Sequence, residues 1–68
     1  MEIAEADLPG LALVGQYRHF GELGPAYCIR KVFRGGEGHQ WMLKIEVVGS
    51  GEILDYPFAQ AQSDPIAS

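Results

Sequence analysis

The chain has a single cysteine, Cys28, and this scarcity excludes several classes of protein. One thiol can form no intramolecular disulfide and no zinc site built from several thiolates. Small secreted domains usually carry several disulfides, because their cores are too small to hold them folded otherwise. The sequence therefore predicts a reducing, cytoplasmic setting.

Long apolar runs and a basic N-terminus are also missing. The longest apolar stretches are residues 11–14 and 41–48, and Lys44 and Glu46 interrupt the second. Both are far shorter than the roughly 20 residues that a membrane-spanning helix needs. Residues 1–7 are acidic where a secretory signal would be basic. We therefore expect a protein that does not associate with membranes.

The spacings typical of catalysis and metal binding are absent as well. His19 and His39 belong to no HxH or HExxH pattern, and Cys28 lies among apolar residues, where a free thiol usually serves as a small core group. The glycine-rich residues 35–38 lack the Lys-Ser/Thr pair of a phosphate-binding loop. The sequence therefore predicts no catalytic residue, no cofactor and no metal site, and we expect that the protein is not an enzyme.

The length of 68 residues allows one small domain. Residues 1–10 are acidic and end in Pro-Gly, which predicts a loosely ordered arm. Residues 11–65 contain the apolar patterning and form the single β domain. Residues 66–68 are expected to be a frayed tail.

Short runs of β-forming residues alternate with glycine-rich turns. The pattern predicts strands over residues 16–20, 26–34, 40–48 and 52–56, followed by one helical or 3₁₀ turn over residues 57–62. We therefore predict an all-β fold: a small antiparallel meander of four to five strands, coiled into an SH3-like barrel. A curved open sheet closed by the C-terminal turn is the alternative.

Two expected strands have a one-sided apolar face. The first places Tyr27, Ile29 and Phe33 at period two. The second face is unbroken and comprises Trp41, Leu43, Ile45 and Val47. We expect these two faces to meet in the interior, so that most aromatic side chains are used to build the core.

Charge is distributed unevenly around the net value of −4. Residues 1–17 carry −3, residues 18–44 carry +3 and residues 45–68 carry −4. The usual explanation is a solvated surface whose acidic ends offset its middle. The alternative is a small basic face for an anionic partner.

Two function classes follow from these patterns. The first is a non-enzymatic protein-interaction or regulatory module that docks a protein partner or a second copy of itself. Met42 and Val48 lie opposite the Trp41 face, and Leu54 adds to them as a candidate interface. The alternative is a module that binds single-stranded nucleic acid. Its candidate residues are Tyr17, Arg18, Arg30, Lys31 and Arg34.

Several stretches in this order resemble a family of short, uncharacterised bacterial proteins. They are FGELGPAY at residues 20–27, the single Trp41, GEILDYP at residues 51–57, and the Asp64-Pro65 pair. The resemblance spans roughly residues 14–67 and implies a small domain of unassigned function. It implies no catalytic residue, and its motif residues are those expected to shape turns and fill the core.

Overall fold

The structure is a computed structural model that describes residues 11–35 and 40–67. The expected acidic arm, residues 36–39 of the glycine-rich loop and Ser68 lie outside the described residues. The chain begins with a 3₁₀ turn, η2 (Leu11–Leu13), and ends with a short helix, α1 (Phe58–Ser63). Four strands lie between them: β1 (Tyr17–His19), β2 (Ala26–Gly35), β3 (Gln40–Val47) and β4 (Ile53–Pro57).

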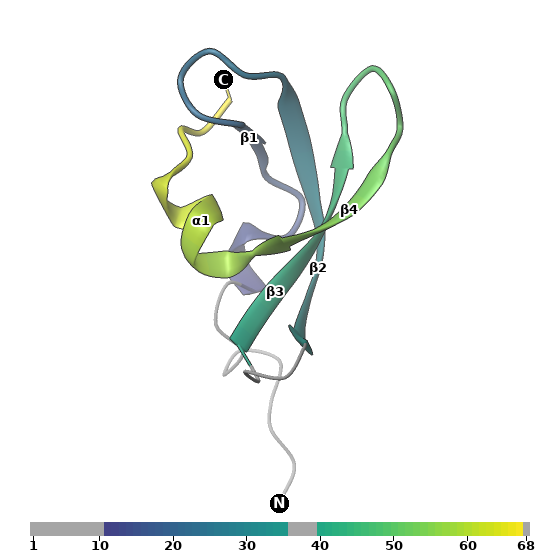
Figure 1. Cartoon of the computed structure of the whole chain (residues 1–68), viewed down its shortest axis with the longest axis vertical. Coiled ribbons are helices and arrows are strands. Elements are labelled where there is room, and N and C mark those ends of the chain that lie inside the picture. Colours follow the sequence, from purple (N-terminus) through teal and green to yellow (C-terminus); the bar gives the residue numbers. More distant parts are fainter. Residues whose placement is uncertain (1–10, 36–39, 68) are drawn as a thin grey trace, which may run out of the picture.

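The four strands form one antiparallel sheet in the order β1-β2-β3-β4 (Figure 1). Each strand pairs with its neighbour in the sequence, so the topology is a meander. This confirms the predicted all-β class, the antiparallel meander and the C-terminal helical turn.

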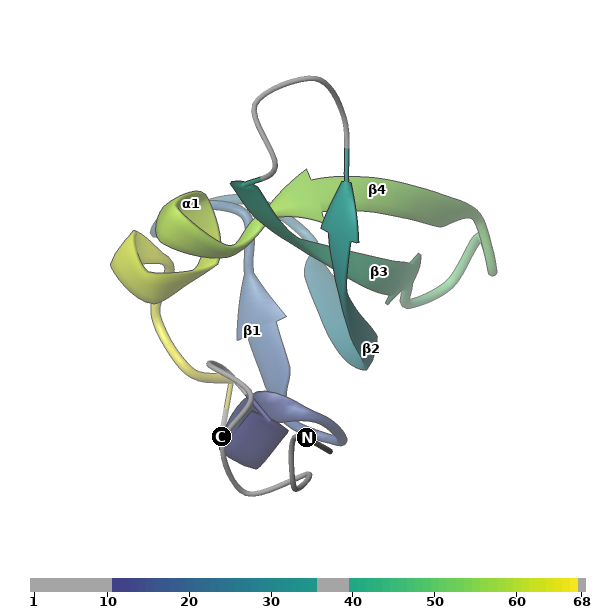
Figure 2. The same cartoon turned by 90° about the horizontal axis from the view of Figure 1, so that it is seen from below.

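Closure into an SH3-like barrel is not confirmed, because the strands of the described residues form an open sheet. Figure 2 shows α1 beside the curved sheet, with the last residues of the chain running back along β1. The backbone N–H of His19 donates to the Pro65 carbonyl at 3.0 Å, and that of Ala67 donates to the Tyr17 carbonyl at 2.8 Å. Residues 66 and 67, expected to fray, thus extend the sheet beyond β1.

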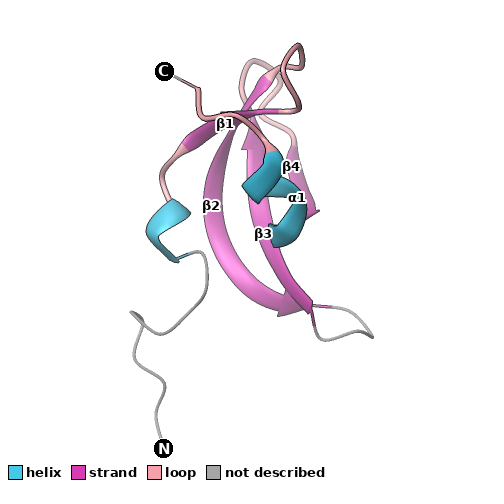
Figure 3. Cartoon of the chain, turned by 90° about the vertical axis from the view of Figure 1, so that its left-hand side faces the viewer, coloured by secondary structure: helices cyan, strands magenta, loops and turns pink. Residues whose placement is uncertain are grey.

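One face of the sheet carries the core. Tyr27 and Ile29 of β2 and Leu43 and Ile45 of β3 are fully buried there. Helix α1 lies across this face and adds Ala61, which is also fully buried (Figure 3). Small side chains let a helix approach a sheet closely, so this short helix can seal the core of a small domain.

A β-bulge at Arg30 changes which side chains of β2 face the core. Ile29 pairs with Ile45, but Lys31 pairs with Lys44, so β2 has one extra residue. Beyond this point Val32, not Phe33, packs against the core. The predicted period-two face of β2 is therefore wrong at Phe33, because the alternation shifts by one residue at the bulge.

Past the bulge, the β2–β3 hairpin extends away from α1. Phe33 pairs with Met42 on the face opposite the core, and the Lys44 ammonium lies 5.6 Å from the Phe33 ring centroid. On the core face, Trp41 is only partly buried, and the Arg34 guanidinium lies 4.8 Å from its ring centroid. Trp41 therefore shields the margin of the core and does not fill its centre.

The β1–β2 turn depends on Gly24. A Cβ atom built there would lie 2.0 Å from the backbone carbonyl oxygen of Phe20, a distance no folded structure tolerates. The turn also holds the Phe20 N–H on the Pro25 carbonyl at 3.0 Å. Any side chain at position 24 therefore forces the backbone of the turn to move.

We predict that Gly24→Ala lowers the free energy of unfolding by about 2 kcal/mol, as overpacking against backbone does. The measurement is urea unfolding followed by tryptophan fluorescence. Leu23→Ala is the control, because Leu23 lies in the same turn and is fully exposed. Equal stability of Gly24→Ala and Leu23→Ala would contradict the close approach.

Candidate functional site

The face of the sheet opposite α1, called the outer face from here on, carries a row of four side chains. Tyr17 of β1 pairs with Cys28 of β2, Cys28 with Glu46 of β3, and Glu46 with Ile53 of β4. Cross-strand partners point to the same side of a sheet, so this row crosses all four strands. Tyr17 and Ile53 are each 51% exposed at its two ends.

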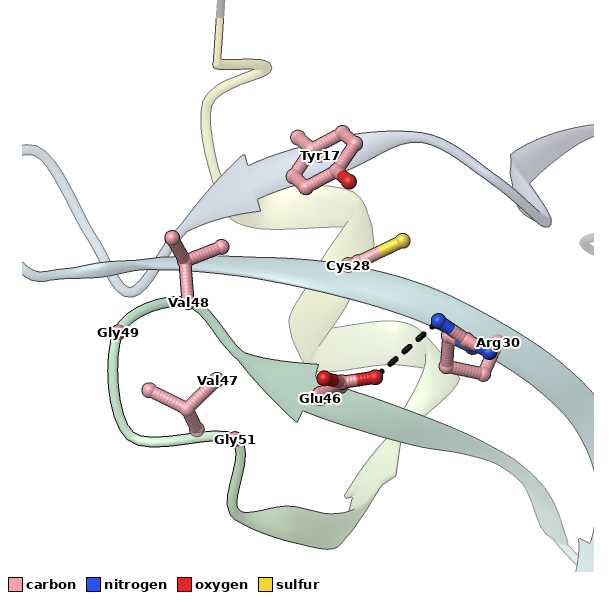
Figure 4. A pocket seen from close by; sticks show the side chains of 8 residues that line it. All are labelled: Tyr17, Cys28, Arg30, Glu46, Val47, Val48, Gly49 and Gly51. Carbon is pink, nitrogen blue, oxygen red and sulfur yellow. Dashed lines mark hydrogen bonds and ion pairs between the residues drawn. The ribbon is translucent and has the colours of Figure 1, made fainter.

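A shallow hollow of about 350 Å³ lies on this row. Figure 4 shows Tyr17 and Val48 on one side of it and the Arg30–Glu46 pair on another, with Cys28 between them. Val48 is 50% exposed, and Cys28 is nearly buried. The hollow thus combines apolar side chains with one ion pair, a composition suited to holding part of another molecule.

Ion pairs within the sheet neutralise the charges of the outer face. Arg30 Nη1 lies 3.1 Å from Glu46 Oε1, and Lys44 Nζ lies 3.0 Å from Asp55 Oδ1. Both pairs are partly exposed, so each contributes little to stability. Their main effect is to cancel four charges, so that Lys31 is the one charge on the described strands of this face outside an ion pair, although the chain carries a net −4.

The structure separates the three predicted interface residues. Met42 and Val48 both belong to the outer side of the sheet, as expected, but six residues of extended chain put them ~20 Å apart. Leu54 lies on the other face, where it is partly buried and packs against the core. Only Val48 adjoins the hollow.

The predicted nucleic-acid residues are also not gathered on one surface. Arg18 is only 8% exposed and points to the α1 side, whereas Tyr17 and Arg30 line the hollow on the outer face. Arg30 is paired with Glu46. Arg34 lies over Trp41, and Lys31 is exposed beside Lys44.

The Asp64 carboxylate is 5% exposed and accepts three hydrogen bonds. Its Oδ2 accepts hydrogen bonds from the Tyr27 hydroxyl at 2.7 Å and the Tyr56 hydroxyl at 2.8 Å. Its Oδ1 accepts one from the Gly21 backbone N–H at 3.1 Å. The carboxylate thereby joins β2, β4, the β1–β2 turn and the end of α1.

Arg18 holds the same region from the other side. Its Nη1 donates to the Ala61 carbonyl at 2.8 Å and to the Asp64 carbonyl at 2.9 Å. The last carbonyls of a helix have no partner within the helix, so Arg18 supplies the donors that α1 needs there. Arg18 is therefore a structural residue that caps α1.

The environment of the carboxylate shifts three titrations. Burial raises the pKa of Asp64, but hydrogen bonds from Tyr27, Tyr56 and Gly21 and the nearby Arg18 charge outweigh it and hold this pKa below its usual value. Burial, then the Asp64 contact, raises the pKa of Tyr56 to about 12, and the same causes raise the pKa of Tyr27 further.

Sequence reasoning did not identify this cluster. Asp64 is 37 residues from Tyr27 and 46 from Arg18 along the chain. No local spacing reports contacts of that range. The one available signal was the combination of Tyr27, Tyr56 and Asp64 within the quoted motifs, since two tyrosines and a carboxylate can share hydrogen bonds.

We predict that Asp64→Asn lowers the free energy of unfolding at pH 7 by about 2 kcal/mol, the usual contribution of buried hydrogen bonds to a charged group. Chemical unfolding at pH 7 measures this loss. Asp55→Asn is the matched control, because it removes an exposed carboxylate that pairs only with Lys44. A loss no larger than that of the control would contradict the role of Asp64.

We further predict a characteristic pH dependence. Because the pKa of Asp64 is lowered in the folded state, ionised Asp64 stabilises the fold above pH 3.8, the ordinary pKa of the group. This stabilisation is lost as the pH falls below that value. Because the pKa of Tyr56 is raised in the folded state, the protonated Tyr56 hydroxyl stabilises the fold below pH 10.0. This stabilisation is lost as the pH rises toward about 12. Thermal unfolding from pH 2 to 12 checks both, and Tyr56→Phe should weaken the alkaline loss.

Two further observations concern sites of other kinds. Within residues 11–35 and 40–67, no three His, Cys, Asp or Glu side chains come together as a metal-binding group. No helix in the described part of the chain has the length and apolar character to cross a membrane.

Comparison with known proteins gives a family but no activity. No curated protein matches the chain. A family model described as a family of unknown function, DUF5397, matches residues 4–68. This match includes the three strands that line the outer-face hollow, the Tyr27–Tyr56–Asp64 cluster and α1. The chain therefore belongs to the family of unknown function DUF5397.

Proposed function

We propose that this protein is a small bacterial, cytoplasmic, non-enzymatic module that binds another protein through the outer face of its sheet. One observation carries the proposal: α1 covers one face of the sheet, whereas the outer face keeps Tyr17 and Val48 about half exposed beside a hollow, with half-exposed Ile53 at the end of the same cross-strand row. Half-exposed apolar groups gathered beside one hollow are typical of interaction surfaces.

The electrostatics of the outer face support a protein partner over a nucleic acid. Phosphate binding requires cations that are free to replace counterions. Here Arg30 and Lys44 are each within ion-pair distance of a carboxylate, and Arg18 is buried beneath α1. A surface with apolar groups and mostly paired charges suits a protein surface of similar character.

The interior supports a role without catalysis. Tyr27, Tyr56 and Asp64 are committed to one another, because Asp64 accepts hydrogen bonds from both tyrosines. A group bonded in this way stabilises the fold and lies away from the hollow.

We predict that Val48→Asp abolishes capture of the partner by the tagged protein from a lysate of cells that encode it. A carboxylate buried there by the partner would lose its hydration and oppose an apolar contact, and Arg30 in the hollow is already paired with Glu46. Leu23→Asp is the matched control, since Leu23 is fully exposed and does not line the hollow. Quantitative mass spectrometry of the captured proteins compares the two variants.

The proposal fails if Val48→Asp and Leu23→Asp capture the same proteins in the same amounts. Circular dichroism of both variants shows whether each remains folded. Because both positions are at least half exposed, we expect both to keep the wild-type thermal transition within a few degrees.

We also predict that the protein does not bind single-stranded DNA or RNA at tens of micromolar. Fluorescence anisotropy of labelled oligonucleotides at low salt measures this. Binding that weakens in the double variant Arg30→Gln, Lys31→Gln would instead favour the nucleic-acid alternative, because those side chains lie together on the exposed side of β2.

A further inference from the structure

The two edge strands of the sheet, β1 and β4, differ in whether another segment of the chain pairs with them. The edge of β1 is covered by the end of the chain, through the bonds from His19 to Pro65 and from Ala67 to Tyr17. The outer edge of β4 forms no backbone hydrogen bond to another described residue. An uncovered edge presents backbone groups that can pair with another strand.

The hydrogen-bond pattern shows which groups of β4 point outward. Val47 N–H donates to the Glu52 carbonyl at 2.8 Å, so these residues form a hydrogen-bonded pair. Such pairs recur at every second residue of antiparallel strands, so Leu54 also turns its backbone groups toward β3. The N–H and C=O groups of Ile53 and Asp55 therefore point away from the sheet.

The part of the β4 edge that can pair with another strand lies between Gly51 and Pro57. Pro57, at the end of β4, has no N–H to donate. Gly51, before the strand, donates its N–H to the Val47 carbonyl at 2.9 Å, within the turn. Between these two residues, only Ile53 and Asp55 offer both an outward donor and an outward acceptor.

We propose that the β4 edge pairs with the same edge of a second copy of this chain, antiparallel about a two-fold axis at Leu54. Ile53 of each copy then lies opposite Asp55 of the other. Four N–H to C=O bonds form, and they use every outward group of Ile53 and Asp55. This dimer rests on the proposed interaction function, for which it supplies one partner.

The neighbouring registers are less satisfactory. An axis at Asp55 would put the two Asp55 carboxylates side by side and would place Pro57, which lacks a donor, opposite Ile53. An axis at Ile53 would place Asp55 opposite Gly51, whose N–H is already bonded to Val47. Like charges directly opposite each other destabilise a strand pair, and a missing donor removes a bond. The axis at Leu54 avoids both faults.

Side chains on both faces suit this register. Leu54 is partly exposed on the core side, and residues at a non-hydrogen-bonded pair approach to a Cα separation of about 4.5 Å. The two Leu54 side chains would therefore touch across the axis. On the outer side, Asp55 already forms an ion pair with Lys44 at 3.0 Å. It therefore places no unpaired charge beside Ile53 of the second copy.

The dimer would also enlarge the outer face. Strands paired within one sheet keep corresponding faces on the same side, so the axis runs perpendicular to the sheet. The two outer faces then form a single eight-stranded surface, with a hollow on each half. This arrangement doubles the surface that the proposed function uses.

Sedimentation velocity of the full chain from about 10 µM to 1 mM tests the dimer, a range chosen because so short an edge gives a small interface. We expect reversible association from 7.4 kDa toward twice that mass. Amide hydrogen exchange followed by NMR provides the local readout. The amides of Ile53 and Asp55 should exchange more slowly as the concentration rises, whereas the amide of exposed Leu23 should not change.

Asp55→Pro is the selective variant, because it deletes an outward N–H and leaves the bonds between β3 and β4 in place. It removes two of the four bonds of the dimer and should weaken association at least about tenfold. Asp55→Asn is the matched control, since it removes the charge and the Lys44 ion pair but keeps the N–H. It should associate within about threefold of the wild type.

A protein that stays monomeric at 1 mM, with fast exchange at Ile53 and Asp55, overturns the dimer. Association that Asp55→Pro leaves unchanged, in a variant whose NMR spectrum shows the native fold, also overturns it. Slow exchange at these two amides only after a different protein is added overturns the second copy as occupant. In each case Val48→Asp still tests the proposed function separately.

Discussion

The carboxylate of Asp64 is the group on which the arrangement of this small domain depends. Two tyrosine hydroxyls and one backbone N–H converge on it, and the backbone around it is held by Arg18. The chain has only 68 residues, and domains of this size bury a smaller fraction of their surface than larger domains do and are marginally stable. Asp64 lets the helix cover the core face of the sheet and the end of the chain cover the edge of β1, because it anchors both to strands far away in the sequence.

This organisation explains why the proposed binding function is assigned to the outer face. The core side is filled by Tyr27, Ile29, Leu43 and Ile45 and sealed by Ala61. On this side, Tyr27, Tyr56 and Asp64 already bond to one another. The outer face has ion pairs and exposed apolar groups. It is therefore the face with surface that another protein could contact.

The sequence predicted the elements of this fold better than their geometry. Alternation in residues 40–48 and the glycines between strands were sufficient for the meander, because both are local signals. The bulge at Arg30 was not predictable, because an extra residue in β2 does not alter the kinds of residue that indicate a strand. It does move Phe33 to the other face. Arg18 was assigned to a basic surface because residues 18–44 carry a net positive charge, and only the position of α1 shows that it caps a helix.

The contact between Arg18 and the Asp64 carbonyl joins residues 46 positions apart. The chain between them must give up its conformational freedom before that contact can stabilise anything. Domains rich in such distant contacts fold more slowly than domains of equal size built from local ones. The interaction that makes a compact fold possible in so short a chain therefore also sets a limit on how fast the chain reaches it.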